Sequence, residues 1–197
     1  MDIELCQLSK VYYFNLQKYY KILKERNTLL KKMAKNGSLL EDTLDIWDKQ
    51  LCAYGTKLAD ERKNFIENLN LKAERIHCDI SASKENLKIE YKESVDYNNF
   101  YEKMVKNRDK DIFYGNTCVG IHKDDMVFYI NGNNARDYAS QGQQRTICLS
   151  LKMAEVELIK EKTGAYPVLL LDDVLSELDK NRQDYILKSI NNIQTII

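Results

Sequence analysis

The chain has 197 residues, of which 44% are hydrophobic and 30% are charged, and its formal net charge is zero. This composition predicts a globular protein of one or two domains and excludes a disordered chain. The mean hydropathy of −0.53 and the lack of a long apolar run predict no membrane span, and the first residues do not have the pattern of a signal peptide.

The first third of the chain has the pattern of two long helices. Apolar residues recur at steps of three, four or seven through residues 5–33, and a second series of this kind runs through residues 40–69. Residues 34–37 interrupt the pattern, and residues 38–41 resemble a capping box that begins the second helix. Because a short connection makes consecutive helices antiparallel neighbours, residues 1–80 are predicted to form a helical hairpin arm.

The first of these helices carries a basic face. From Lys10 to Lys35 there are eight lysine or arginine residues and one acid, and the lysines project away from the apolar face. Two interpretations stay open: an ordinary solvated face, or a stripe that follows the phosphates of DNA. The lysines that would contact DNA are Lys18, Lys21, Lys24, Lys31, Lys32 and Lys35. Arg26 and Arg62 fall on the apolar faces, where a buried guanidinium needs partners, so we expect structural roles for both.

Beyond residue 80 the pattern changes to shorter strands and helices. Alternating hydrophobicity predicts strands at 85–93, 117–121 and 126–130, with an Asn131-Gly132 turn after the last. Helical patterns occupy 97–107, 149–160 and 179–191, and the polar segment 139–146 precedes the second of these. The continuous apolar run 168–171 predicts a strand buried on both faces, as in a parallel sheet, and 194–197 predicts the beginning of another strand.

One segment of this second part has the pattern of a magnesium site. The apolar run ends in Asp172 and Asp173, which is the Walker B arrangement. Mg²⁺ keeps most of its water ligands and takes one or two carboxylates beside the phosphates, and a second acid can polarise the attacking water. A calcium loop over residues 172–179 is excluded, because the glycine and the terminal glutamate of an EF-hand are missing.

Two further segments have both a functional and a structural interpretation. Ser140 and Gly142 precede a predicted helix, where backbone N–H groups can bind an anion, and the alternative is a plain N-cap by Ser140. Ser176 and Asp179 follow shortly after the acids, and the alternative here is a capping turn with Asp179 as the N-cap of the last helix.

Taken in this order and spacing, the three segments resemble the signature motif, Walker B motif and D-loop of ABC-type ATPases, and in particular those of the bacterial RecF family. Residues 138–146 and 169–179 carry most of this resemblance. Residues 119–126 are similar to the family's Gly-Pro-His-Arg-Asp-Asp segment, but have Ile121 and Lys123 in place of proline and arginine. The short arm and Glu25-Arg26-Asn27 are also similar, so the resemblance spans essentially the whole chain.

The resemblance implies a mixed α/β fold. It consists of the antiparallel helical hairpin arm, residues 1–80, and the signature and Walker B half of an ABC-type P-loop ATPase sheet, residues 81–197. No G-x-x-x-x-G-K-[ST] sequence occurs in the chain. We therefore expect the C-terminal half of a RecF-family protein without the lobe that holds the phosphate-binding loop, and no measurable ATPase activity from this half alone.

The resemblance also implies a role for each site residue. In the family two subunits enclose ATP, so that the signature loop of one subunit contacts ATP bound by the other. The residues concerned are Ser140, Gln141, Gly142 and Gln143 for this contact, Asp172 for Mg²⁺ through water, Asp173 for catalysis, and Ser176 and Asp179 for the D-loop interface.

The function implied is that of an ATP-dependent clamp on DNA. Members of the family dimerise on ATP at double-stranded, gapped DNA, work with RecO and RecR, and indirectly help to place RecA. This implies a cytoplasmic, nucleoid-associated bacterial protein of recombinational repair, replication and the SOS response.

Two other classes of protein stay as alternatives. One is another SMC-like repair ATPase of the OLD or RecN type, against which the short arm and residues 140–146 argue. The other is a non-enzymatic helical interaction module, which would require three motifs to coincide by accident. Residues expected to have no special chemistry are His77 and His122, as core or surface histidines, and the five separated cysteines, as buried small side chains.

Overall fold

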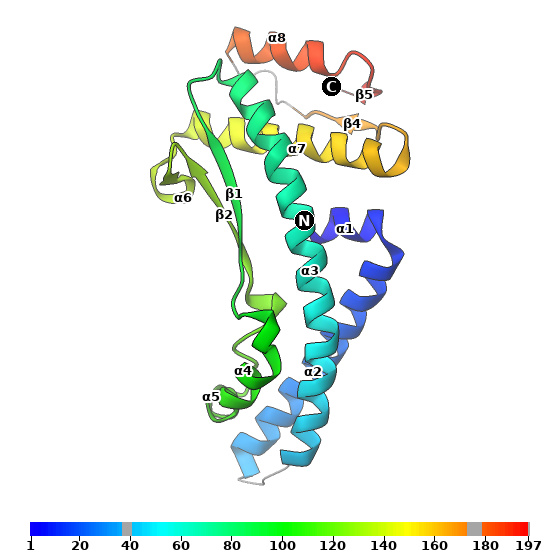
Figure 1. The fold of residues 1–197 in the computed structure, drawn as a ribbon, viewed down its shortest axis with the longest axis vertical. Helices are drawn as coiled ribbons and strands as arrows, with labels where there is room; N and C mark the ends of the chain where they lie inside the picture. The colour runs from blue at the N-terminus through cyan, green and yellow to red at the C-terminus, as the bar shows by residue number, and fades with distance from the viewer. Residues whose placement is uncertain (37–40, 173–178, 197) are drawn as a thin grey trace. The chain divides into compact units, whose positions relative to one another are not determined.

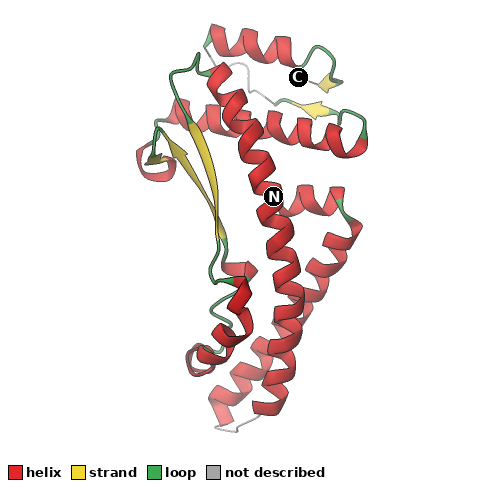
Figure 2. Ribbon diagram, viewed as in Figure 1, coloured by secondary structure: helices red, strands yellow, loops and turns green. Residues whose placement is uncertain are grey.

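The computed structural model describes residues 1–36, 41–172 and 179–196 (Figures 1 and 2). The chain divides into two compact units, each made of two stretches of sequence. Unit 1 comprises Met1–Asn64 and Tyr91–Asp125, and unit 2 comprises Phe65–Glu90 and Met126–Ile197. The expected boundary between arm and ATPase half, at residues 80 and 81, stays a prediction.

Unit 1 is built from helices. Its elements are α1 (Asp2–Leu8), α2 (Lys10–Asn36), the first part of α3 (Glu41–Ile80), η1 (Tyr97–Asn99), α4 (Phe100–Lys106), α5 (Arg108–Tyr114) and η2 (Ile121–Lys123). Helices α2 and α3 run in opposite directions, and a cluster of Leu29, Leu30, Met33 and Leu44 joins them (Figure 1). The predicted helical hairpin is therefore confirmed, whereas its capping box falls on residues 37–40, outside the described residues.

The predicted apolar faces of the two long helices are largely buried. Those residues with less than a tenth of their surface exposed are Leu5, Tyr12, Tyr19, Leu23, Leu30, Met33, Leu44, Leu51, Leu58, Phe65 and Leu69. The first helix is not continuous, because Ser9 between α1 and α2 adopts an extended conformation. The Ser9 hydroxyl accepts a hydrogen bond from the Tyr12 amide at 3.0 Å, which is the geometry of an N-cap and explains the break.

The strand predicted at residues 117–121 is wrong. The Thr117 amide donates to Asn27 Oδ1 at 2.9 Å, and the Gly120 amide donates to Ser94 Oγ at 3.0 Å. Gly120 has a φ of +121°, far from the negative φ of regular strands. Because side chains take the amide hydrogen bonds of a strand ladder, the apolar residues here belong to a buried loop. The helix predicted at 97–107 is present as η1 and α4.

Unit 2 combines helices with small sheets. Its elements are the last part of α3, most of β1 (Leu87–Lys92) and β2 (Asp125–Ile130), then β3 (Asn133–Asn134), α6 (Ala135–Tyr138), α7 (Gln141–Thr163), β4 (Leu169–Leu170), α8 (Lys180–Ser189) and β5 (Thr195–Ile196). One sheet has the order β1-β2-β3, and β4 pairs with β5 in parallel. Asn131 and Gly132 have φ of 50° and 81°, which confirms the predicted turn between β2 and β3.

Two predictions in unit 2 need correction. Helix α7 begins at Gln141 and not at residue 149, because residues 141–145 are polar and mostly exposed and do not show the apolar periodicity of the rest. The strand at 168–171 is buried on one face only: Leu169 and Leu171 are buried, whereas Val168 and Leu170 are 53% and 69% exposed. Among the described residues, side chains cover only that one face of the β4–β5 pair.

The cysteines were expected to be buried, and only Cys52 is. Cys6, Cys78 and Cys118 are partly exposed, and Cys148 is exposed on α7 because it faces outward between the buried Ile147 and Leu149. No helix in the described part of the chain combines the length and apolar character needed to cross a bilayer.

Candidate functional site

The N-terminus of α7 carries the predicted signature residues. Ser140 is the N-cap, and its hydroxyl accepts from the Gln143 amide at 3.2 Å while Gln143 Oε1 accepts from the Ser140 amide at 2.9 Å. The N-cap interpretation of Ser140 is therefore confirmed. It is compatible with anion binding, because a hydroxyl that accepts one hydrogen bond still has a proton to donate.

This helix end also has the electrostatics of an anion site. Ser140, Gln141 and Gly142 are exposed at the start of a helix of 23 residues. The amides of Gln141 and Gly142 belong to the first turn, where no intrahelical acceptor exists. The aligned peptide dipoles of a long helix add a partial positive charge at this end. The end of α7 can therefore bind a phosphate oxygen.

Gly142 is not required by the packing of the chain itself. A Cβ added at Gly142 would lie 3.7 Å from Arg182 Nη1 and 4.0 Å from Ser140 Oγ, which are ordinary contact distances. At Gly55, in contrast, the added Cβ would lie 2.7 Å from Phe100 Cε1. The glycine at position 142 therefore leaves room on the outer surface of the helix, where a ligand can approach the backbone.

The acidic residues are only partly within the described residues. Asp172 is exposed and follows β4 at the carboxyl end of its parallel pairing with β5, where ligands bind in α/β sheets. Asp173 and Ser176 lie outside the described residues. Asp179 is the predicted N-cap of α8, and its carboxylate accepts from the Arg182 amide at 3.1 Å.

Within the described ranges, no group of three or more histidine, cysteine or acidic side chains could hold a metal ion. A single exposed carboxylate such as Asp172 fits Mg²⁺, because this ion keeps several waters and needs only one or two protein ligands.

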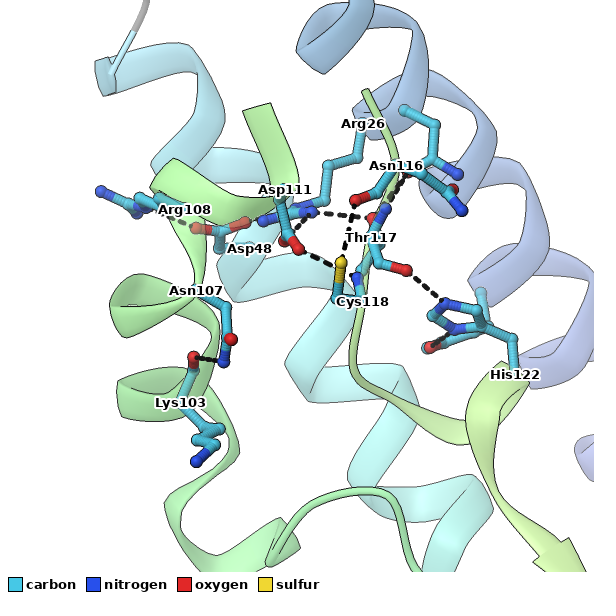
Figure 3. A network of polar contacts seen from close by, with 12 residues as sticks. Arg26, Asp48, Lys103, Asn107, Arg108, Asp111, Asn116, Thr117, Cys118 and His122 are labelled. Carbon is cyan, nitrogen blue, oxygen red and sulfur yellow. Dashed lines mark hydrogen bonds and ion pairs between the residues drawn. The ribbon is translucent and has the colours of Figure 1, made fainter. Parts of the chain in front are cut away.

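Arg26 lies at the centre of a buried polar cluster in unit 1 (Figure 3). Its side chain has no exposed surface. The guanidinium donates to Asp48 Oδ1 at 2.6 Å, to Asp111 Oδ2 at 2.8 Å and to Thr117 Oγ1 at 2.7 Å. Arg108 donates to the second oxygen of Asp48 at 2.8 Å. The cluster ties α2, α3 and α5 together, so the expected structural role of Arg26 is confirmed.

Arg62 has a second cluster of the same kind. It donates to Asp2 Oδ2 at 2.7 Å, to the Tyr12 hydroxyl oxygen at 3.0 Å and to the Ile121 carbonyl at 2.6 Å. The structural role expected of Arg62 is therefore confirmed as well. Ile121, which departs from the family pattern, is itself buried, whereas the other departure, Lys123, is exposed.

His122 is also held inside unit 1. Its Nε2 lies 3.0 Å from the Thr117 carbonyl oxygen, which can only accept, so Nε2 carries the proton. Its Nδ1 therefore accepts from the Tyr19 hydroxyl at 2.9 Å. Burial lowers the pKa of His122 and favours the neutral ring. His122 is thus a structural histidine, as expected.

Comparison with known proteins decides the family. Over 198 residues the chain is 52% identical to the DNA replication and repair protein RecF of Lachnospira eligens, and the match covers 100% of the chain and 54% of that relative. The chain belongs to the RecF family. The RecF of Clostridium novyi is 48% identical over 202 residues, with 55% of its length covered. This chain thus spans about half the length of these curated RecF relatives, and no protein-family model matches it.

Solved RecF structures match the fold. A structure of the recombination mediator protein RecF with ATP in the RecFOR pathway has a TM-score of 0.91 and 39% identity, and covers 100% of this chain and 54% of that one. A second RecF structure, described as RecF-ATPrS, has a TM-score of 0.88 and 40% identity, with 100% and 55% covered. The mixed α/β fold and the ABC-type ATPase class predicted from the sequence are confirmed.

The six candidate lysines of this RecF-family chain are all exposed on α2. Among the ion pairs formed by the described residues, none uses any of these lysines. Lys18 lies over the Phe14 ring, at 5.3 Å from its centroid. An exposed basic face is common to both interpretations, the solvated face and the DNA-binding stripe, so the choice between them stays a prediction.

Proposed function

We propose that this chain supplies the signature loop and the Walker B carboxylates of a RecF-type, ATP-dependent DNA-binding protein. The observation that carries the proposal is the exposed N-terminus of α7, with the Ser140 hydroxyl and two first-turn amides beside a glycine that internal packing does not require. The names of the relatives, DNA replication and repair protein RecF, and the RecF–ATP structure support the same function.

The signature loop acts on nucleotide held by a second copy of the protein. The hydroxyl of Ser140 and the amides of Gln141 and Gly142 donate to the γ-phosphate, while Gln143 maintains the cap. Such donors stabilise the charge that develops on the phosphoryl oxygens during transfer. Because they reach ATP only in the dimer, ATP binding and dimerisation are coupled.

The acids act on the nucleotide bound by their own subunit. Asp172 would hold Mg²⁺ through water, and Asp173 would orient or activate the attacking water. Ser176 and Asp179 of the D-loop contact the partner subunit.

DNA is the macromolecular partner in this proposal. Lysines 18, 21, 24, 31, 32 and 35 would follow the phosphates of double-stranded, gapped DNA, and neutralising phosphates releases condensed counterions. The full protein would work with RecO and RecR and indirectly help to place RecA, in the bacterial cytoplasm at the nucleoid.

The test uses a full-length RecF-type protein that contains this sequence, and its Ser140→Arg variant. Light scattering with and without Mg-ATP measures the mass of the particles. We expect ATP to dimerise the unmodified protein and to leave the variant monomeric, because the long arginine side chain would occupy the space of the γ-phosphate. The variant must still bind nucleotide and unfold at an unchanged temperature. Equal behaviour of the two proteins would show that Ser140 is not at a dimer-bound phosphate.

A further inference from the structure

Glu85 lies in the turn between α3 and β1. Within unit 2 it contacts the N-terminal end of α7, which carries the predicted signature residues and is called the signature end below. Its side chain is 15% exposed. One carboxylate oxygen, Oε1, accepts from Gln143 Nε2 at 3.0 Å, and the other, Oε2, lies 3.1 Å from His77 Nε2. Glu85 thus joins the capping-box glutamine to a histidine that is wholly buried in α3.

The polarity of these bonds is fixed at both ends. Gln143 Oε1 accepts from the Ser140 amide, so the Gln143 amide group must turn its NH₂ toward Glu85. Burial lowers the pKa of His77, which leaves a neutral ring with one N–H. That N–H is on Nε2, because Glu85 only accepts.

The His77 contact returns to α7. With the proton on Nε2, His77 Nδ1 lies 3.1 Å from the Ser150 hydroxyl oxygen, whose single proton has two acceptors within reach, this nitrogen and the Thr146 carbonyl oxygen at 2.8 Å. Ser150 lies on the buried face of α7, beyond the exposed first turn that carries Gln143. These polar contacts therefore connect the N-cap of α7, through Glu85 and His77, to the body of the same helix.

A strained turn holds Glu85 in this place. Ala82 and Ser83 have φ of 52° and 60°, a left-handed conformation that is unfavourable for residues other than glycine. The Ser81 hydroxyl accepts from the Glu85 amide at 3.3 Å, and Ser81 itself is buried. The turn returns the chain from α3 to β1 and places Glu85 against His77.

We propose that Glu85 is a positioning residue for the signature loop, and that it acts through Gln143 to orient the Ser140 hydroxyl and the first-turn amides of α7. The orientation toward a phosphate rests on the function proposed above. The orientation of the cap itself does not, so the two can be tested separately.

A pair of substitutions reverses the polarity of the contact. Gln143→Glu alone places a carboxylate against Glu85, and the repulsion separates the two side chains. With Glu85→Gln added, every bond can form again. The carboxylate at position 143 accepts from the Ser140 amide and from the new NH₂ at position 85, whose carbonyl oxygen accepts from His77. If Glu85 had a merely structural role, the effects of the two substitutions would add. If the two side chains are in direct contact, the second substitution reverses the effect of the first.

Hydrogen exchange measured by mass spectrometry in the full-length protein reports directly on the stability of the capping box of α7. We expect Gln143→Glu to accelerate exchange in residues 138–147 on the order of tenfold, because a charge-assisted bond is lost. The double variant should return to the exchange of the unmodified protein. Gln144→Glu is the matched control, since it adds the same charge one residue along, where the side chain donates to the Ala139 carbonyl. An equal effect of Gln143→Glu and Gln144→Glu, or no rescue, would overturn the proposal.

ATP-dependent dimerisation of the same variants separates the two proposals. We expect it to weaken in Gln143→Glu and to recover in the double variant, while nucleotide binding to the protein's own phosphate loop stays unchanged. If exchange responds as described and dimerisation does not, the positioning of the cap stands and the nucleotide role of the loop is refuted.

Discussion

Two glycines in helices differ in whether the packing of the chain requires them: Gly55 is required, and Gly142 is not. Gly55→Ala would bring a Cβ to 2.7 Å from Phe100 Cε1, so we expect a loss of roughly 1–3 kcal/mol in the free energy of unfolding. Gly142→Ala meets only ordinary contacts, so stability should be unchanged or slightly higher. Its ATP-dependent dimerisation should nevertheless weaken, because the methyl group occupies the approach to the backbone. Thermal unfolding and light scattering measure the two effects; a Gly142→Ala protein that dimerises normally would contradict the assignment.

His122 makes stability depend on pH in a defined direction. Burial lowers the pKa of His122 below its ordinary 6.5, so the unfolded chain binds more protons than the folded one as the pH falls through this range. The contribution of His122 to the free energy of unfolding is constant well above pH 6.5. It decreases as the pH falls below 6.5, by up to about 1.4 kcal/mol per pH unit. Denaturant unfolding between pH 7.5 and 5, compared with His122→Gln, should show a shallower acid loss in the variant. Parallel curves would contradict this account. His77, whose pKa is also lowered, remains in both proteins.

The residues at the N-terminal end of α7 that form the candidate site could be predicted from the sequence. The contacts that hold these residues in place could not. The N-cap geometry of Ser140 and of Asp179 follows from local spacing, and both are present. Glu85 and His77 were missed as parts of the site, because Glu85 and Gln143 are 58 positions apart and only the fold brings them together. The one local signal was Gln143 at the third position of a capping box, whose NH₂ group needs an acceptor.

At the element scale, the Arg26 cluster determines how α2, α3 and α5 pack. Arg26→Met would leave the fully buried carboxylates of Asp48 and Asp111 without their main partner. Breaking a buried ion pair from one side costs about 3–5 kcal/mol, so the free energy of unfolding should fall by that amount. Glu25→Gln, on the exposed neighbouring residue, is the control and should have little effect. Chemical denaturation measures both, and a loss of under about 1 kcal/mol for Arg26→Met would show that this cluster is not desolvated.

Helix α2 also carries the proposed DNA-binding lysines. If Lys18, Lys21 and Lys24 contact phosphates, their joint replacement by glutamine should reduce the slope of log K against log salt by roughly 0.9 per lysine removed. Exposed lysines on other helices of unit 1, Lys57, Lys63 and Lys106, provide a control set with the same charge change. Duplex affinities of the full-length protein at several salt concentrations test this. Equal slopes for the two sets would favour the solvated-face interpretation.

The elements that were predicted correctly are those with long or simple periodicity. Helices α2 and α3 follow from their apolar faces, and β1 and β2 from alternation. The break at Ser9 and the loop at 117–121 were missed for one physical reason: side-chain oxygens accept the amide hydrogen bonds there, and apolar periodicity does not report such bonds. The exposed face of β4 was missed because an apolar run does not show which of its faces is covered.

At the scale of the whole molecule, the α/β class and the RecF family follow from three weak motifs taken together. Each motif alone has a plain structural interpretation, and Ser140 and Asp179 do serve as N-caps. Their order and spacing favour the fold of an ABC-type ATPase over an interaction module, and the match of the whole chain to about half of a RecF structure confirms that fold class. No G-x-x-x-x-G-K-[ST] sequence occurs among these 197 residues, so the proposed function assigns to them the signature and Walker B contacts and not those of the phosphate-binding loop.

In the proposed function, the signature residues of one subunit act on nucleotide bound by another. Mixing two inactive variants of the full-length protein, Ser140→Arg and Asp172→Asn, tests it most directly. In a mixed dimer one composite site combines an intact signature loop from the Asp172→Asn subunit with an intact Walker B carboxylate from the Ser140→Arg subunit. We expect ATPase activity, absent from each variant alone, to appear in the mixture. A mixture as inactive as its components, with mixed dimers shown to form, would contradict it.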